Sequence, residues 1–291
     1  MTDLDHSLPD LDNMLRTSLL QEIGSRQSLT LAELKAAFAY VRILNLYFPG
    51  SPRTKLFLNH LYARLSNLMI TIDEAMETQK SAPPFSLLSK DWLKLLTSDE
   101  PTEWILPPKR DWDRCKGSAP RFRGYPCSVW TVFHALTVAA SLDPKADNEI
   151  GLDVLQTMAS YVRHFFGCRH CALHFGSMYK EITANVTTSD DAVLWLWEAH
   201  NRVNKRIHGD PGEDPDAPKD QFPTDEMCGD CRGQNGAWMR ENVLAFLKRH
   251  YTFNVTDAGT SGSVSTMQPS VFVFRLGLLF WLMFSRQWLR V

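Results

Sequence analysis

The sequence has little net charge, glycine, proline or cysteine, and each shortage excludes a class of protein. A net charge of −2 at pH 7 gives no electrostatic footprint for nucleic acid, so we expect no nucleic-acid partner. Fifteen glycines and 16 prolines in 291 residues exclude collagen-like and low-complexity chains. Six cysteines are too few to build a miniprotein from disulfides. With 44% hydrophobic residues, the chain can bury the core of one large or two modest domains.

Residues 28–78 carry the pattern of two consecutive helices. Thr30 and Glu33 have the spacing of a capping box, and an apolar stripe at helical spacing follows them. Pro49 and Gly50 end this first helix, and the second starts directly after them. The amino-terminal part of the chain is therefore predicted to be helical.

Four further helices are predicted between residues 124 and 208. They begin at Gly124, near Asp147, at Cys168 and at a capping box on Thr188. We find no convincing alternation of apolar and polar residues that would indicate a strand. The predicted fold is therefore all-α, a four-helix bundle preceded by a second helical unit.

Composition divides the chain into four predicted segments. Residues 1–100 form a helix-rich domain without a cofactor, and residues 101–250 form the bundle domain. Residues 251–270 are rich in Ser, Thr and Gly, which is typical of a flexible linker. Residues 271–291 are apolar enough to form a transmembrane anchor, with the body of the protein in the lumen because arginines follow the apolar run. The alternative is an apolar tail that does not insert.

Signals for the cellular compartment conflict. The amino terminus lacks the basic start and apolar stretch of a signal peptide. Asn185 and Asn254, however, each begin a tripeptide that accepts N-glycosylation. Together with paired cysteines, they favour the secretory pathway, at the Golgi or ER membrane, or an extracellular location. We therefore expect a fragment or shorter isoform of a protein whose signal lies upstream.

The cysteines fall into three pairs, and the central pair has the spacing of a redox centre. Cys168 and Cys171 form a CxxC motif at the start of a helix, where the helix dipole and free amides stabilise a thiolate. A second interpretation is a zinc site that combines this pair with Cys228 and Cys231, although a long helix separates the two pairs. A third is a set of inert disulfides. The spacing alone leaves all three open.

Polar and aromatic side chains gather on helix faces that should meet at the centre of the bundle. An apolar core would not use them, because buried polar atoms need partners. A planar polar ligand between the helices would supply both stacking and hydrogen bonds. The set comprises Trp130, His134, His174, Trp197, His200, Asn201 and Asn204.

Several motifs together carry a resemblance to a known family. They are Cys115-x11-Cys127, Arg121-Phe-Arg-Gly-Tyr-Pro-Cys-Ser-Val-Trp-Thr-Val-Phe-His134, Phe165-Phe-Gly-Cys-Arg-His-Cys-Ala-Leu-His-Phe175 and Leu194-Trp-Leu-Trp-Glu-Ala-His-Asn-Arg-Val-Asn204. In residues and spacing, this part of the chain resembles the flavin domain of quiescin sulfhydryl oxidases, which is an Erv/ALR-type domain. Residues 1–100 resemble the helix-rich region that precedes that domain.

The resemblance implies a thiol oxidase that holds FAD noncovalently in the bundle. Protein or small-molecule thiols would attack the Cys168–Cys171 disulfide at Cys168, and Cys171 would pass the electrons to the flavin. Molecular oxygen would take them up as H2O2. The Cys115–Cys127 and Cys228–Cys231 disulfides would be structural, and no metal is expected. The implied FAD-binding residues are Arg123, Trp130, His134, His170, His174, Trp197, His200, Asn201, Asn204, Lys219 and Phe222.

This sequence departs from the family pattern in three places. His170 stands where family members commonly have Asp, and Phe222 stands where a tryptophan usually stacks on FAD. The chain also lacks the amino-terminal thioredoxin domain that collects electrons from substrates. Two alternatives therefore stay open: a truncated flavoprotein with weak turnover, and a zinc-binding or purely structural helical module in the lumen.

Overall fold

The computed structural model describes residues 8–78, 85–97, 105–147, 149–180 and 186–253. All of them belong to one compact unit that spans residues 1–256. The predicted anchor, both predicted glycosylation sites and the predicted linker from residue 254 onward lie outside the described residues. Within the described part of the chain, no helix combines the length and apolar character that crossing a bilayer requires.

The described chain is mostly helical, as the sequence predicts. In chain order the elements are α1 (Leu8–Thr17), the π-helical segment η2 (Ser18–Ile23), β1 (Ser28–Thr30), α2 (Leu31–Tyr47), α3 (Pro52–Thr78), β2 (Ser86–Leu88), α4 (Ser89–Leu95), α5 (Gly124–Leu142), α6 (Ile150–Phe165), α7 (Arg169–Tyr179), α8 (Ser189–Ile207) and α9 (Arg240–His250).

The two predicted helices of residues 28–78 are α2 and α3, and local signals define their ends. The Thr30 hydroxyl accepts the Glu33 amide at 3.3 Å, and the Glu33 carboxylate accepts the Thr30 amide at 2.9 Å. This reciprocal capping box satisfies amides that a helix start would leave unpaired. At the start of α3, the Ser51 hydroxyl accepts the Thr54 amide at 3.2 Å. Both predicted starts are confirmed.

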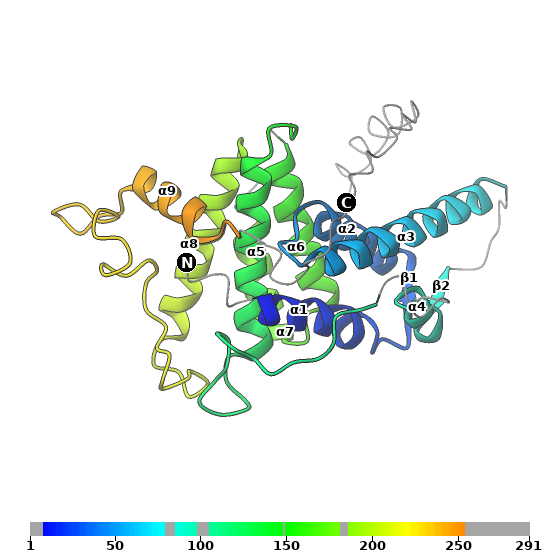
Figure 1. Cartoon of the computed structure of the whole chain (residues 1–291), viewed down its shortest axis with the longest axis horizontal. Helices are drawn as coiled ribbons and strands as arrows, with labels where there is room; N and C mark the ends of the chain where they lie inside the picture. The colour runs from blue at the N-terminus through cyan, green and yellow to red at the C-terminus, as the bar shows by residue number, and fades with distance from the viewer. Residues whose placement is uncertain (1–7, 79–84, 98–104, 148, 181–185, 254–291) are drawn as a thin grey trace, which may run out of the picture. The chain divides into compact units, whose positions relative to one another are not determined.

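Helices α5, α6 and α8 run side by side, and α7 packs against the end of α6 (Figure 1). Of the predicted starts, those of α5, α7 and α8 are confirmed, whereas α6 begins at Ile150 rather than near Asp147. Cys168 is the N-cap of α7, and Thr188 caps α8 in a box with Asp191. The apolar stripe of α6 is buried between its neighbours, with Leu155 and Met158 in the core.

Six elements were not predicted, and the two strands among them contradict the expectation that the chain holds no strand. Strands β1 and β2 pair antiparallel, with Leu29 opposite Leu87. Each has only three residues, too few to show alternation in the sequence. The others are α1 with η2, the short α4, and α9. In α9, Val243, Phe246 and Leu247 are buried at helical spacing, a pattern that the sequence does contain.

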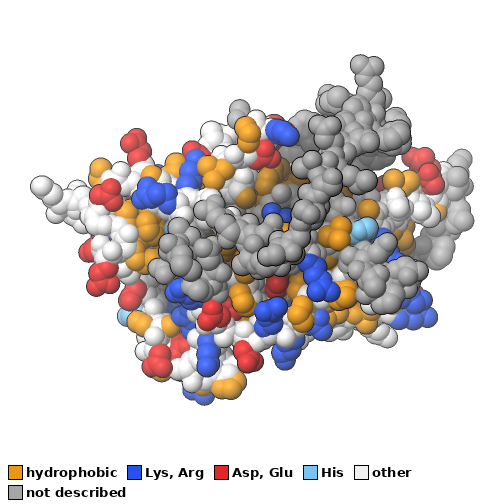
Figure 2. Space-filling model, viewed as in Figure 1, with side chains coloured by type: hydrophobic (Ala, Val, Ile, Leu, Met, Phe, Trp, Pro, Cys, Tyr) orange, Lys and Arg blue, Asp and Glu red, His pale blue; other side chains and the backbone are white. Residues whose placement is uncertain are grey.

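The helices before residue 100 pack directly on those after it. Helix α1 contacts α5, and α2 contacts both α5 and α6. The Tyr40 ring of α2 stacks on the Tyr161 ring of α6 with centroids 4.1 Å apart. The domain boundary near residue 100 stays a prediction. Figure 2 shows basic and acidic side chains interspersed on the face that it presents, in keeping with the small net charge.

The α8 capping box generates a prediction about stability and pH. Burial raises the pKa of Asp191, but hydrogen bonds from Thr187 and Thr188 outweigh burial and hold that pKa below its usual value. A depressed carboxyl pKa contributes stability above the unfolded-state pKa, and this contribution is lost as pH falls through the folded-state pKa. Asp191→Asn should therefore lower the free energy of unfolding by about 1 kcal/mol at pH 7 and by much less at pH 3.

Urea unfolding at the two pH values measures this difference. Asp191→Ala, which also removes the hydrogen bonds, should be destabilised at both. An Asp191→Asn variant that loses the same free energy at pH 3 as at pH 7 would contradict the assigned role of the charge.

Candidate functional site

The Cys168–Cys171 pair forms an exposed disulfide at the amino-terminal end of α7. The Cys168 sulfur accepts the backbone amide of Cys171 at 3.2 Å, in the position of an N-cap. Gly167 separates this end from α6, and the exposed Arg169 begins α7. Free amides and the helix dipole stabilise a thiolate at such a position, and exposure lets an external thiol reach the sulfurs. The pair can therefore exchange with thiols from solution.

All six cysteines are in disulfides, which bears on the zinc interpretation. Cys115 pairs with Cys127, and Cys228 pairs with Cys231. Both sulfurs of the Cys228–Cys231 pair are buried in a small core that α9 helps to form. A bonded sulfur offers no thiolate, so in this oxidised form the chain presents no four-thiolate zinc set.

Helices α5 and α8 meet through a stack of aromatic rings. The Trp130 and His200 rings are parallel within 2°, with centroids 4.1 Å apart. His134 Nε2 lies 3.1 Å from His200 Nδ1, within hydrogen-bond distance. The Tyr251 ring, directly after α9, stacks on His134 with centroids 4.7 Å apart. Three residues that the sequence predicts for one site are thus brought together, and Tyr251 joins them.

The two histidines of this stack are held neutral at physiological pH. Burial lowers the pKa of His134 well below its usual value, and the nearby His200 and His250 add to the effect. Burial and then the charge of Lys219 lower the pKa of His200 to about 3. Because each neutral imidazole has one N–H, one ring donates to the other across the α5–α8 contact.

A hydrogen-bonded clasp joins α8 to the segment after it. The Asn201 amide nitrogen donates to the Phe222 carbonyl at 2.7 Å, and its oxygen accepts the Phe222 amide at 2.8 Å. The Trp197 indole N–H donates to the same carbonyl. One turn further along, the Asn204 amide donates to the Asp220 carbonyl at 2.9 Å. These three side chains of α8 therefore fix the course of residues 220–222.

Two cations from different segments, Arg123 and Lys219, interact electrostatically. Arg123 is the N-cap of α5, and burial together with its charge lowers the pKa of Lys219. The negative charges of Glu213 and Asp214 act to raise the pKa of Lys219. Two half-buried cations that interact in this way are suited to an anionic group of a ligand.

His170 and His174 occupy α7, downstream of Cys168. Their Nε2 atoms are 3.1 Å apart, and their rings meet edge to face. Phe175 of the same helix contacts Trp130, with ring centroids 6.2 Å apart. Helix α7 is thus joined to the aromatic stack through Phe175, while the two histidines contact each other.

Two orphaned polar atoms test whether these residues fit a bound cofactor. Among the described residues, Arg123 Nε and His134 Nδ1 are buried and have no hydrogen-bond partner. Buried nitrogen atoms are nearly always paired in folded proteins. Both atoms belong to residues predicted to contact FAD, so the donor set fits a polar ligand that would supply the missing partners.

Tyr251 is a site residue that the sequence did not predict, because α9 was not predicted either. Tyr251 is buried against His134 at the end of that helix. The spacing of Val243, Phe246 and Leu247 was the signal that could have found it.

Comparison with known proteins gives concordant results. The Erv1 / Alr family model matches residues 127–223. Sulfhydryl oxidase 1 of Gallus gallus is 41% identical over 246 residues, which covers 84% of this chain and 31% of that protein. Sulfhydryl oxidase 2 of Homo sapiens is 39% identical over 251 residues, covering 83% and 34%. The chain therefore spans about a third of the length of these curated relatives.

A solved structure described as "Sulfhydryl Oxidase Fragment of Human QSOX1" resembles the chain over most of both lengths. The TM-score is 0.72 at 36% sequence identity, and the match covers 84% of this chain and 94% of that one. A match over 84% of this chain extends beyond the part that carries the disulfides into the amino-terminal part.

The clasp on Phe222 predicts a graded loss of stability. Asn201→Ala removes both a donor and an acceptor from a partly buried backbone, so we expect the free energy of unfolding to fall by about 2 kcal/mol. Asn204→Ala, the matched control, removes one hydrogen bond and should cost about 1 kcal/mol. Urea unfolding of both variants and of the natural chain measures these losses, and equal losses would contradict the two hydrogen bonds from Asn201 to Phe222.

The histidine pair predicts a loss of stability in acid. Both folded-state pKa values lie below the usual value of 6.5, so the unfolded chain takes up protons first and stability falls as pH drops below about 6.5. His200→Gln removes one titrating group. The variant should lose about 2 kcal/mol less stability than the natural chain between pH 7 and pH 5. Urea unfolding measures the free energy of unfolding of both proteins at the two pH values. Equal losses between pH 7 and pH 5 would refute the lowered pKa of His200.

Proposed function

Since this chain belongs to the quiescin sulfhydryl oxidase family with its Erv1/Alr domain, we propose that it is an FAD-dependent enzyme that oxidises thiols to disulfides and reduces O2 to H2O2. The observation that carries the proposal is the exposed Cys168–Cys171 disulfide at a helix start, on a helix that packs against the Trp130–His200 stack. Protein or small-molecule thiols are the proposed substrates.

The chemistry of the dithiol follows from its position. A substrate thiolate attacks the Cys168 sulfur, the Cys168–Cys171 bond breaks, and Cys171 leaves as a thiolate. A second substrate thiolate then attacks the mixed disulfide at the substrate sulfur, which releases the oxidised substrate and leaves Cys168 reduced. The dithiol has gained two electrons and the substrate has lost two. The amides at the start of α7 stabilise the thiolates that these steps create.

The proposed cofactor residues have separate tasks. Trp130, His134 and His200 supply flat faces and hydrogen-bonding nitrogens, and Arg123 and Lys219 supply positive charge for a diphosphate. His170, His174, Trp197, Asn201, Asn204 and Phe222 complete the proposed set. When bound, FAD would supply the two-electron chemistry between the reduced dithiol and oxygen. The aromatic side chains exclude water around the ring system.

Other features of the proposal rest on sequence alone. The location in the secretory pathway or outside the cell, glycosylation at Asn185 and Asn254, and attachment to a membrane stay predictions. The same is true of the structural role of the Cys115–Cys127 and Cys228–Cys231 disulfides, although the burial of Cys115, Cys228 and Cys231 supports it.

The proposed function predicts that one CxxC pair, Cys168 and Cys171, is needed for turnover and that the other, Cys228 and Cys231, is not. The full chain should purify with flavin and consume O2 when dithiothreitol is added. Cys171→Ser should retain flavin, yet dithiothreitol should not reduce that flavin rapidly, because the dithiol that delivers electrons is gone. The control is the Cys228→Ser, Cys231→Ser double variant, which should keep its turnover per bound flavin.

Anaerobic stopped-flow absorbance of the flavin and an oxygen electrode measure the two steps. Rapid reduction of the Cys171→Ser flavin by dithiothreitol, or loss of turnover in the control alone, would overturn the assignment of Cys168 and Cys171.

A further inference from the structure

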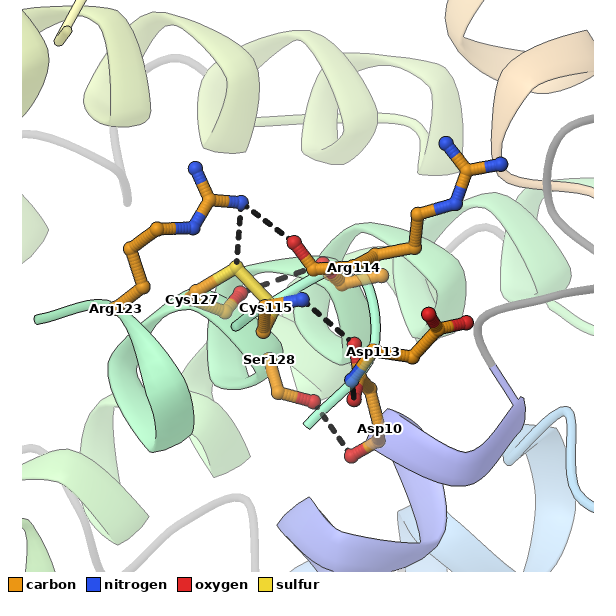
Figure 3. Close-up of a disulfide and its surroundings, with 8 residues drawn as sticks. Asp10, Asp113, Arg114, Cys115, Arg123, Cys127 and Ser128 are labelled. Atoms are coloured by element: carbon orange, nitrogen blue, oxygen red, sulfur yellow. Dashed lines mark hydrogen bonds between the residues drawn. A yellow bond between two sulfur atoms is a disulfide. The ribbon is translucent and has the colours of Figure 1, made fainter. Parts of the chain in front are cut away.

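Asp10 of α1 is a buried carboxylate that holds a backbone segment of the bundle region. Its side chain is only 2% exposed. One carboxylate oxygen accepts the Asp113 amide and the other accepts the Cys115 amide, each at 2.7 Å (Figure 3). The Ser128 hydroxyl donates to the Asp10 backbone carbonyl, also at 2.7 Å. Helix α1 is thereby attached to the chain on both sides of the Cys115–Cys127 disulfide.

Residues 113–115, which Asp10 fixes, in turn fix the side chain of Arg123. The Arg114 carbonyl accepts a hydrogen bond from Arg123 Nη2 at 2.8 Å, and the same nitrogen lies 3.6 Å from Cys127 Sγ (Figure 3). The Cys115 carbonyl accepts the Gly124 amide at 2.8 Å. Arg114 lies between the two residues whose amides Asp10 accepts. The position of its carbonyl therefore depends on the Asp10 carboxylate.

Arg123 itself has an unusual backbone conformation, and one of its side-chain nitrogens has no hydrogen-bond partner. Its φ is +59°, in the left-handed region that non-glycine residues rarely adopt. Its Nε is buried and has no partner in the described structure. A costly backbone conformation that carries a half-buried guanidinium with one buried, unpaired nitrogen is typical of a ligand-binding position.

We propose that Asp10 is a positioning residue for the cofactor: through residues 113–115 it places the Arg123 guanidinium to bind the diphosphate of FAD. This inference rests on the proposed function. It assigns to the amino-terminal region, expected to be free of any cofactor role, a part in building the cofactor site.

Both oxygens of Asp10 are needed for this task. Two amides point at the side chain, and each requires an acceptor. Asparagine offers one carbonyl oxygen, and its NH2 group would face an amide N–H. Asp10→Asn should therefore release one end of residues 113–115 and with it the Arg114 carbonyl.

A double-mutant cycle on FAD affinity tests the proposal. The flavin-free full chain is titrated with FAD and followed by quenching of flavin fluorescence, for the natural chain, Asp10→Asn, Arg123→Met and the double variant. We expect Asp10→Asn to weaken FAD binding about tenfold. The double variant should bind no more weakly than Arg123→Met alone, because Asp10 acts through Arg123.

Riboflavin, which has no diphosphate, separates positioning from general damage. Asp10→Asn should leave riboflavin affinity within about twofold of the natural chain, whereas a general loss of structure weakens both ligands alike. Ser128→Ala is the matched control, since it removes a contact to the same residue without touching residues 113–115. It should leave FAD affinity within about twofold.

Additive losses in the cycle, equal losses for FAD and riboflavin, or a Ser128→Ala effect as large as that of Asp10→Asn would each overturn the proposal. If Asp10→Asn does not fold, Asp10→Glu, which keeps both oxygens but moves them by one methylene, is taken through the same cycle. A chain that binds FAD and obeys the cycle yet consumes no O2 with thiols would refute the oxidase function and leave the role of Asp10 intact. A natural chain that binds no FAD would refute both.

Discussion

A hydrogen bond between the buried imidazole of His134 and the half-buried imidazole of His200 joins the two helices that carry most of the candidate site. Burial keeps both rings neutral, and protonation of both would remove the acceptor nitrogen of this hydrogen bond. The Trp130 ring stacks on His200 and the Tyr251 ring stacks on His134, so the pair lies between them. The packing of α5 on α8 therefore depends on polar groups that a purely apolar core would not contain. The same groups help to fix the position of α9.

Side chains of one segment repeatedly meet the backbone of another around this centre. Asn201 holds both polar groups of Phe222, and Asp10 holds two amides beside the Cys115–Cys127 disulfide. Such contacts fix loops that have no regular hydrogen bonding of their own. The exposed Cys168–Cys171 disulfide differs, because a helix start and a single amide hold it and leave its sulfurs open to solvent. Rigid surroundings and an accessible disulfide are what thiol exchange beside a bound cofactor requires.

Local signals made much of the fold predictable. The capping box at Thr30, the break at Gly167 and the cap at Thr188 depend on residues a few positions apart, so the sequence shows them directly. Strands β1 and β2 were not predictable, because three residues show no periodicity. Asp10 was not predictable either, since its partners lie about a hundred residues away and nothing local marks them. Helical spacing placed His134 and His200 on inward faces, but spacing alone cannot tell which imidazole pairs with which.

We propose that the polar set between these helices binds FAD. The most direct measurement is the visible absorption spectrum of the purified full chain, before and after denaturation. We expect a yellow protein with a flavin spectrum, from which denaturation releases free FAD in stoichiometric amount. A folded, colourless chain that stays colourless after incubation with FAD would contradict it.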